Sequence, residues 1–193
     1  MQIAGILLAA GESYVQPSPL ALLPYQGLSF VDNILNNLSE IHCSPVITIL
    51  GESAELICNE TRVNTFQCFN NPDPEGGPLS SIKLALEHLP AETDGVILAM
   101  VEHPLVKLET YQAIHKAAQN GPGQIIIPEF YGRKGHPIYF GKNFFNLLRN
   151  AADDMESDEI IERLVDEIKT IPVQDEGIIM NIDHEDGLSE LLH

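Results

Sequence analysis

One stretch decides the fold: Gln2-Ile3-Ala4-Gly5-Ile6-Leu7-Leu8-Ala9-Ala10-Gly11, an apolar run of strand length that ends in small residues. Similar runs, rich in β-branched residues, recur at residues 45–50, 64–69, 95–101 and 124–128. Their apolar residues are continuous and do not alternate with polar ones, so each run predicts a strand that is buried on both faces.

Amphipathic patterns separate these runs. Residues 29–41 place four apolar side chains on one helical face, namely Phe30, Ile34, Leu38 and Ile41. Residues 79–89, 108–119 and 158–167 show the same spacing. Strands that alternate with helices predict a Rossmann-like, doubly wound α/β fold with a mostly parallel sheet. Ligands of such sheets bind at the carboxyl ends of the strands, so the loops after Ala9, Phe69 and Val101 are candidate sites.

The length and composition favour one domain that spans residues 1–193, because 193 residues with 44% hydrophobic content fill one core. The sequence contains no apolar window of the length that a bilayer requires, and its first residues lack the basic start of a signal peptide. We therefore expect a cytoplasmic protein.

Three cysteines without a CxxC pair predict buried free thiols rather than a disulfide framework or a zinc site.

The charge of the chain narrows the possible partners. The formal net charge is −18, from 28 acidic and 10 basic residues, which argues against nucleic acid or an anionic membrane as a partner. The distribution is uneven, because the first lysine or arginine is Arg62. The first third of the chain therefore offers no basic side chain of permanent charge to an anionic ligand.

Five segments carry the candidate chemistry. The first is the loop at residues 8–24, where small residues leave a buried strand and allow backbone N–H groups to approach a nucleotide. The others have polar or glycine-rich character: Asn71-Pro72-Asp73-Pro74-Glu75-Gly76-Gly77-Pro78-Leu79-Ser80-Ser81-Ile82, Val101-Glu102-His103-Pro104-Leu105-Val106, Gly132-Arg133-Lys134-Gly135-His136-Pro137 and Asn181-Ile182-Asp183-His184-Glu185-Asp186-Gly187-Leu188.

In this order, the five segments resemble the MobA/MocA-like NTP transferase family. The segment from Gly132 to Pro137 is most similar to that of the cytidylyltransferases for molybdopterin. The resemblance implies a fold of the nucleotide-diphospho-sugar transferase type. It also implies Mg²⁺-dependent transfer of a nucleoside monophosphate from an NTP, CTP in preference to GTP, to a phosphorylated small-molecule acceptor in molybdenum cofactor biosynthesis.

The resemblance also assigns roles to residues. Nucleotide binding falls to Leu8, Ala9, Ala10, Gly11, Asn71, Gly77, Ser80 and Ser81. Metal binding and catalysis fall to Glu102 and Asp183, whose hard oxygen ligands suit Mg²⁺. Acceptor binding falls to Arg133, Lys134 and His136. Each position also has a structural alternative: a carboxylate at a strand end for Glu102, a helix cap for Ser80 or Ser81, and a packed ring for His136.

The phosphate loop departs from the family pattern. The arginine and lysine that grip the phosphates in the family fall at Val15 and Leu20, and Pro17 and Pro19 remove backbone donors. The loss of two charged partners would cost about 3–6 kcal/mol of transition-state binding. The sequence therefore leaves three hypotheses open: an impaired nucleotidyltransferase, a non-catalytic nucleotide-binding or protein-interaction module, and a sugar-phosphate nucleotidyltransferase. The oligomeric state stays open as well.

Overall fold

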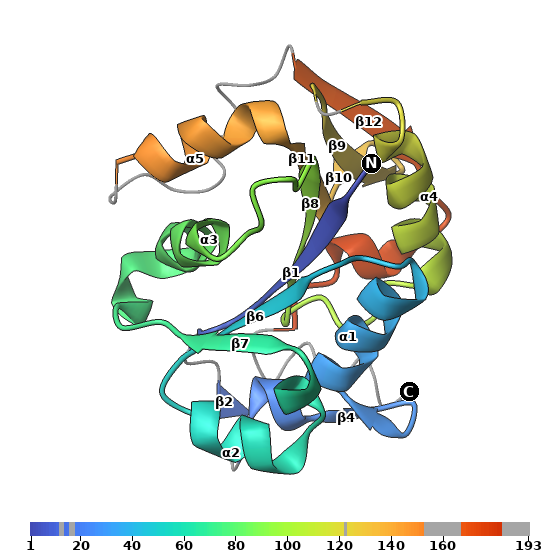
Figure 1. Cartoon of the computed structure of the whole chain (residues 1–193). Coiled ribbons are helices and arrows are strands. Elements are labelled where there is room, and N and C mark those ends of the chain that lie inside the picture. The colour runs from blue at the N-terminus through green and yellow to red at the C-terminus, as the bar shows by residue number, and fades with distance from the viewer. Residues whose placement is uncertain (12–13, 16–17, 122, 153–166, 183–193) are drawn as a thin grey trace.

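The computed structural model describes residues 1–11, 14–15, 18–121, 123–152 and 167–182. Its centre is an eight-stranded mixed sheet (Figure 1). Four parallel strands form one half of the sheet, in the spatial order β7, β6, β1 and β8. Their bounds are β1 Ile3–Ala9, β6 Val46–Leu50, β7 Gln67–Asn70 and β8 Gly95–Met100. The predicted doubly wound α/β fold is confirmed, and the predicted strands lie within one to three residues of the observed ones.

The other half of the sheet introduces antiparallel pairing. β11 (Ile138–Gly141) lies antiparallel between β8 and β9 (Ile125–Phe130), and β12 (Ile168–Pro172) runs parallel to β9 along its other side. The short β10 (Arg133–Lys134) also pairs with β9, opposite Glu129 and Phe130. Since β12 occupies one side of β9, β10 continues the line of β11 on the other side. The segment Gly135-His136-Pro137 interrupts that line.

Helices cover both faces of the sheet (Figure 1). α1 (Phe30–Glu40) and α4 (Leu108–Ala118) cover one face and contact each other, while α3 (Gly77–Glu87) and α5 (Phe145–Asn150) cover the opposite face. Along β1, Ile3 and Leu7 join the core under α1 and α4, and Ala4, Ile6 and Leu8 join the core under α3 and α5. Burial on both faces is the reason that the strands read as continuous apolar runs.

The helix predicted at residues 29–41 is confirmed as α1, which begins after Ser29. The Ser29 hydroxyl accepts a hydrogen bond of 3.1 Å from the Asp32 backbone N–H, so Ser29 caps the helix. The predicted inward residues Phe30, Ile34 and Leu38 are buried. The helices predicted at 79–89 and 108–119 correspond to α3 and α4, whereas the one at 158–167 falls, except for Glu167, outside the described residues.

Short elements fill the connection between β1 and α1. The hairpin of β2 (Tyr14–Val15) and β3 (Ser18–Pro19) leads into a 3-10 turn at Leu20–Leu22, and a second hairpin joins β4 (Pro24–Tyr25) to β5 (Leu28–Ser29). α2 (Ala54–Glu60) follows β6 and contacts the 3-10 turn.

Two further findings bear on the predictions. Only Cys43 is buried, and Cys58 and Cys68 are partly exposed, so the prediction of buried thiols is wrong for two of the three cysteines. Within the described residues, no helix combines the length and apolar character needed to cross a membrane.

Candidate functional site

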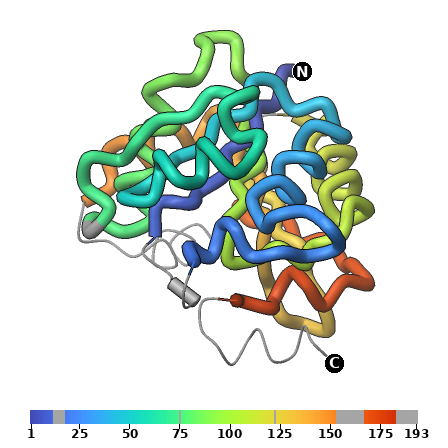
Figure 2. Tube along the Cα trace, turned by 90° about the horizontal axis from the view of Figure 1, so that it is seen from below, coloured from blue at the N-terminus to red at the C-terminus, as the bar shows by residue number. Residues whose placement is uncertain are grey.

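The segments that follow the parallel strands meet at one edge of the sheet, the edge that faces the viewer in Figure 2. The Val101 backbone N–H donates to the Leu8 carbonyl at 3.0 Å, and the Asn71 N–H donates to the Leu50 carbonyl at 2.8 Å. The backbone of Gly51 lies so close to Ala10 that an added Cβ would stand 2.3 Å from the Ala10 carbonyl oxygen. The loops after β1, β6, β7 and β8 therefore form one continuous surface.

The larger of two pockets at this edge, here called the large pocket, has a cavity volume of about 90 Å³. Its walls come from the loop after β1, the start of α3 and the loop after β8: Leu8, Ala10, Gly11, Pro74, Gly77, Pro78, Ser81, Met100 and Glu102. The structure thus brings together six of the residues that the sequence predicted for the nucleotide and the metal. Pro74, Pro78 and Met100 were not predicted as site residues.

Asn71 organises the wall that α3 contributes. Its buried side-chain amide donates to the hydroxyls of Ser80 at 2.8 Å and Ser81 at 2.9 Å, and its carbonyl oxygen accepts from the Asp73 backbone N–H at 2.9 Å. Neither serine caps the helix, because α3 begins at Gly77, its N-cap is Gly76, and both serines lie within the helix. The predicted capping alternative is therefore wrong. Asn71 and Ser80 support the pocket, and Ser81 lines it.

The turn before α3 depends on two glycines. Gly77 has φ +70° and ψ −169°, a conformation that is essentially confined to glycine. A Cβ on Gly76 would lie 2.7 Å from a carboxylate oxygen of Asp73. The pair lets the chain turn tightly into the helix and present backbone rather than side chains to the pocket.

Glu102 closes the large pocket opposite α3. Its Oε1 atom would be 3.4 Å from a Cβ built on Gly11, so the carboxylate faces the end of the first loop. The Glu102 carbonyl accepts a hydrogen bond of 2.8 Å from the Ile182 backbone N–H. Asp183, the second predicted metal ligand, lies outside the described residues. Within the described part of the chain, no three His, Cys, Asp or Glu side chains group as a metal site.

The predicted acceptor residues lie on β10 and in the interruption between β10 and β11. The His136 backbone N–H donates to the Ile178 carbonyl at 2.9 Å, and its ring stacks on His103 with 4.8 Å between centroids. The Nδ1 atom of His136 is buried, and no described group forms a hydrogen bond with it. Burial, and to a lesser extent His103, lowers the pKa of His136 to about 3. The ring therefore stays neutral at physiological pH.

Arg133 and Lys134 are exposed on β10, beyond the interruption that contains His136. Neither lines the large pocket. They follow a tight turn in which Tyr131 and Gly132 both have positive φ, and Tyr131 is 84% exposed at its tip. The structure thus stacks His136 on His103, the residue that follows Glu102 in the sequence, and leaves the basic pair in solvent.

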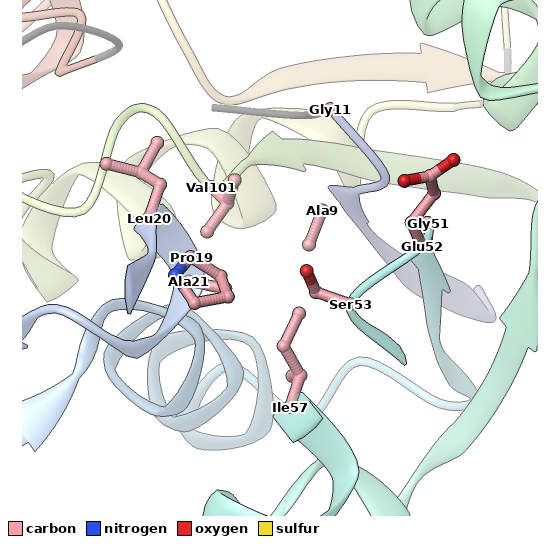
Figure 3. Close-up of a pocket in the computed structure, with 10 residues that line it drawn as sticks. All are labelled: Ala9, Gly11, Pro19, Leu20, Ala21, Gly51, Glu52, Ser53, Ile57 and Val101. Carbon is pink, nitrogen blue, oxygen red and sulfur yellow. The ribbon is translucent and has the colours of Figure 1, made fainter. Parts of the chain in front are cut away.

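A second pocket, here called the small pocket, lies under the loop that follows β1 (Figure 3). Ala9, Ile57 and the Ser53 hydroxyl point toward one another across it, whereas the Glu52 carboxylate is turned away. Its cavity volume is about 20 Å³. The sequence missed Gly51, Glu52 and Ser53, although their place directly after a predicted parallel strand was a usable signal.

The described lining residues of the two pockets include no lysine or arginine. Leu20, which the resemblance aligns with the family lysine, is 2% exposed, belongs to the core under α1 and α4, and lines the small pocket. Arg62, the first basic residue of the chain, is engaged with α1, because its guanidinium bonds to Asn36 and lies 3.8 Å from the Asp32 carboxylate. The side chain of Val15 is outside the described set.

Comparisons with known proteins agree with this architecture. The family model of the MobA-like NTP transferase domain matches residues 5–168. The nicotine blue oxidoreductase of Paenarthrobacter nicotinovorans is 26% identical over 144 residues, which cover 70% of this chain and 69% of that protein. The bifunctional protein GlmU of Staphylococcus epidermidis is 26% identical over 180 residues, 88% of this chain but only 38% of GlmU.

Among solved structures, Rv0371c of Mycobacterium tuberculosis H37Rv superposes with a TM-score of 0.87 at 21% identity, over 99% of this chain and 97% of that one. A structure of the same protein in complex with manganese gives a TM-score of 0.82 at 22% identity, over 100% and 98% of the two chains. At this level of identity the likeness establishes the fold.

Proposed function

Because the chain belongs to the MobA-like NTP transferase family, we propose that it binds a nucleoside triphosphate in the large pocket and transfers the nucleoside monophosphate to a phosphorylated small molecule. The observation that carries the proposal is the arrangement of Gly11, Ser81 and Glu102 around one pocket at the carboxyl edge of the sheet. Glycine and alanine residues that allow close approach to the backbone, a hydroxyl and a carboxylate meet there, and such a set suits nucleotide recognition.

The apolar part of the large pocket suits a base and a ribose. Pro74, Pro78 and Met100 supply flat, uncharged walls, and Gly77 permits close approach of the ligand to the backbone. Ser81, held by Asn71, supplies a fixed hydroxyl. We favour CTP over GTP, by the likeness of the segment from Gly132 to Pro137 to the cytidylyltransferases for molybdopterin.

Glu102 suits a divalent cation bound together with the nucleotide phosphates. Mg²⁺ in such sites takes one or two carboxylates and keeps its remaining positions for water and phosphate oxygens, so a full cage of protein ligands is unnecessary. Glu102 supplies one carboxylate, and we assign the second to Asp183. When bound, the cation would neutralise charge on the triphosphate as pyrophosphate leaves.

The reaction is an in-line displacement. An oxygen of the acceptor phosphate attacks the α-phosphorus of the NTP, the bond from that phosphorus to the oxygen bridging to the β-phosphate breaks, and pyrophosphate leaves with the bond electrons. Arg133 and Lys134 are placed in solvent where an acceptor anion can reach them. Neutral His136 is suited to position the acceptor rather than to carry a charge to it.

Turnover should be low. The described residues of both pockets supply no basic side chain for the triphosphate, and Leu20 occupies the core instead of reaching a phosphate. The same observation favours a second candidate function, a homologue that binds a nucleotide or a protein partner without transferring anything. The name of the relative nicotine blue oxidoreductase denotes redox chemistry, so likeness at 26% identity does not entail nucleotidyl transfer.

A thermal unfolding panel tests binding. CTP, GTP and ATP are each added with Mg²⁺, with Mn²⁺ and with EDTA, and pyrophosphate release is measured in parallel with a phosphorylated pterin as acceptor. We expect a rise in the unfolding midpoint that needs both CTP and the cation, with slow pyrophosphate release. Absence of any nucleotide-dependent shift at millimolar concentration would refute nucleotide binding. A clear shift without pyrophosphate release would favour the non-catalytic candidate.

A further inference from the structure

Two of the three cysteines are placed for a chemistry that the proposed function does not use. Cys58 lies on α2 and Cys68 on β7, and both are partly exposed. Both pack against the same core cluster, the one that lies under α1 and α4. The elements that carry them are joined by only a short connection, which contains a 3-10 turn at Val63–Thr65.

Asn64 holds the two cysteine positions together. Its side-chain amide donates to the Cys58 carbonyl at 2.7 Å, and its Oδ1 atom lies 4.0 Å from the Cys68 sulfur. One asparagine thus contacts the backbone of one cysteine and the thiol of the other. The connection between α2 and β7 is thereby folded so that Asn64 lies against both cysteine residues.

The Cys58 thiol lies within electrostatic reach of Cys68. Burial raises the pKa of the Cys58 thiol, and the neighbouring Cys68 raises it further. Cys43 provides the contrast, because it is buried and its pKa is raised to about 12 by burial alone. The thiolate is the reactive form of cysteine, so Cys43 is inert by comparison.

We propose that Cys58 and Cys68 form a reversible intramolecular disulfide that links α2 to β7 when a two-electron oxidant such as hydrogen peroxide is present. The Cys68 thiolate attacks one peroxide oxygen, the O–O bond breaks, and the released hydroxide takes up a proton to become water. The Cys58 sulfur then attacks the sulfenic acid on Cys68, the S–O bond breaks, and a second water leaves. Two thiols lose two electrons in total, which peroxide accepts.

The crosslink joins two elements that lead to the pockets. α2 carries Ile57, which lines the small pocket (Figure 3) and precedes Cys58 in the sequence. β7 leads into Asn71, which positions Ser81 in the large pocket. The disulfide therefore restrains one wall of each pocket, independently of whether the pocket takes a nucleotide.

The test oxidises the purified full-length protein with a small excess of hydrogen peroxide at pH 8. Free thiols are then titrated in denaturant, and the protein is digested without reduction for peptide mass spectrometry. We expect loss of two of the three thiols, a linked peptide that contains Cys58 and Cys68, and full recovery with dithiothreitol. The oxidised protein should unfold at a midpoint higher by about 5 °C, because the crosslink restricts the unfolded chain.

Three variants serve as controls. Cys43→Ser should still lose two thiols, whereas Cys58→Ser and Cys68→Ser should each lose the linked peptide and the rise in midpoint. Circular dichroism of each reduced variant establishes that it is folded. Independent oxidation of Cys58 and Cys68 to sulfinic acids without a linked peptide would overturn the proposal, and so would disulfides that join two chains.

Discussion

At the scale of single residues, Glu102 and Leu20 define what the site keeps and what it lacks. Glu102 keeps a carboxylate at the end of β8, turned toward Gly11. Leu20, which the resemblance aligns with a lysine of the family, belongs to the core and also lines the small pocket. Its apolar side chain therefore stabilises the loop that precedes α1.

Replacement of Glu102 by glutamine should remove the cation-dependent part of nucleotide binding, because the amide keeps the shape of the carboxylate but loses its charge. We expect at least a tenfold loss of affinity for the nucleotide in the presence of Mg²⁺, in line with about 1.5–3 kcal/mol for a charged partner. Isothermal titration with and without Mg²⁺ measures it. The control is Glu52→Gln, whose carboxylate is turned away from the small pocket; an equal loss in both variants would contradict the role of Glu102.

Leu20→Lys should destabilise the protein rather than restore a phosphate grip. The substitution removes a side chain that is 2% exposed and places an ammonium group in an apolar core. We expect a loss of about 2–4 kcal/mol in the free energy of unfolding. Urea denaturation measures it, with Leu28→Lys as the control, because Leu28 is 38% exposed. A stable Leu20→Lys variant with tighter nucleotide binding would show that the lysine can reach the pocket.

At the scale of elements, the turn into α3 and the interrupted strand formed by β10 and β11 shape the site. Gly76 and Gly77 let the chain enter α3 while Asn71 holds its first turn. At the interruption, the His136 backbone N–H donates a hydrogen bond to the Ile178 carbonyl instead of to a neighbouring strand. In this position the His136 ring stacks on His103. Both features place polar groups on rigid supports beside a pocket.

Gly77→Ala should weaken nucleotide binding and destabilise the fold, because alanine tolerates its backbone conformation poorly. We expect a loss of about 1–3 kcal/mol in the free energy of unfolding, with a measurable fall in nucleotide affinity. Gly27→Ala is the matched control, since Gly27 also has a positive φ of 84° but lies in the hairpin of β4 and β5. The control should lose stability alone. Unchanged affinity in Gly77→Ala would remove this turn from the ligand site.

At the scale of the whole molecule, the net charge of −18 repels every anionic ligand that approaches the protein. Several described basic side chains are engaged away from the pockets: Lys83 bonds to the Ala151 carbonyl and Arg149 to the Leu86 carbonyl. A triphosphate therefore approaches an acidic protein with little attraction from these groups. A bound cation must therefore supply most of the positive charge that neutralises the triphosphate.

His136 should make stability depend on pH between about 6.5 and 3. Its folded pKa of about 3 lies below the ordinary value of 6.5, so the unfolded chain takes up a proton in this range and the folded protein does not. The stabilising contribution is complete above pH 6.5 and is lost as the pH falls toward 3. Urea denaturation at pH 7 and pH 5 measures it against His136→Gln, which should lose less stability on acidification than the natural chain. An equal loss in both would contradict the shift.

The sequence predicts the fold more completely than it predicts the contacts of the candidate site. Strands and helices were predicted because continuous apolar runs and amphipathic spacing are local patterns, as β1 and α1 illustrate. β11 was missed because its place in the sheet comes from antiparallel pairing with β8 and β9, which no local pattern shows. Ser80 and Ser81 were weighed as helix caps because the sequence could not show that Asn71, nine and ten residues earlier, binds both hydroxyls.

The sequence by itself determined the order of the predicted strands β1, β6, β7, β8 and β9 and of the helices α1, α3 and α4, and also the absence of lysine and arginine before Arg62. Both are properties of neighbouring residues or of composition. Only the tertiary structure decided that Glu102 faces Gly11, that Leu20 belongs to the core, and that Asn64 contacts both Cys58 and Cys68. These facts depend on contacts between separate elements. Such contacts follow from how the sheet and helices pack, and no local pattern encodes them.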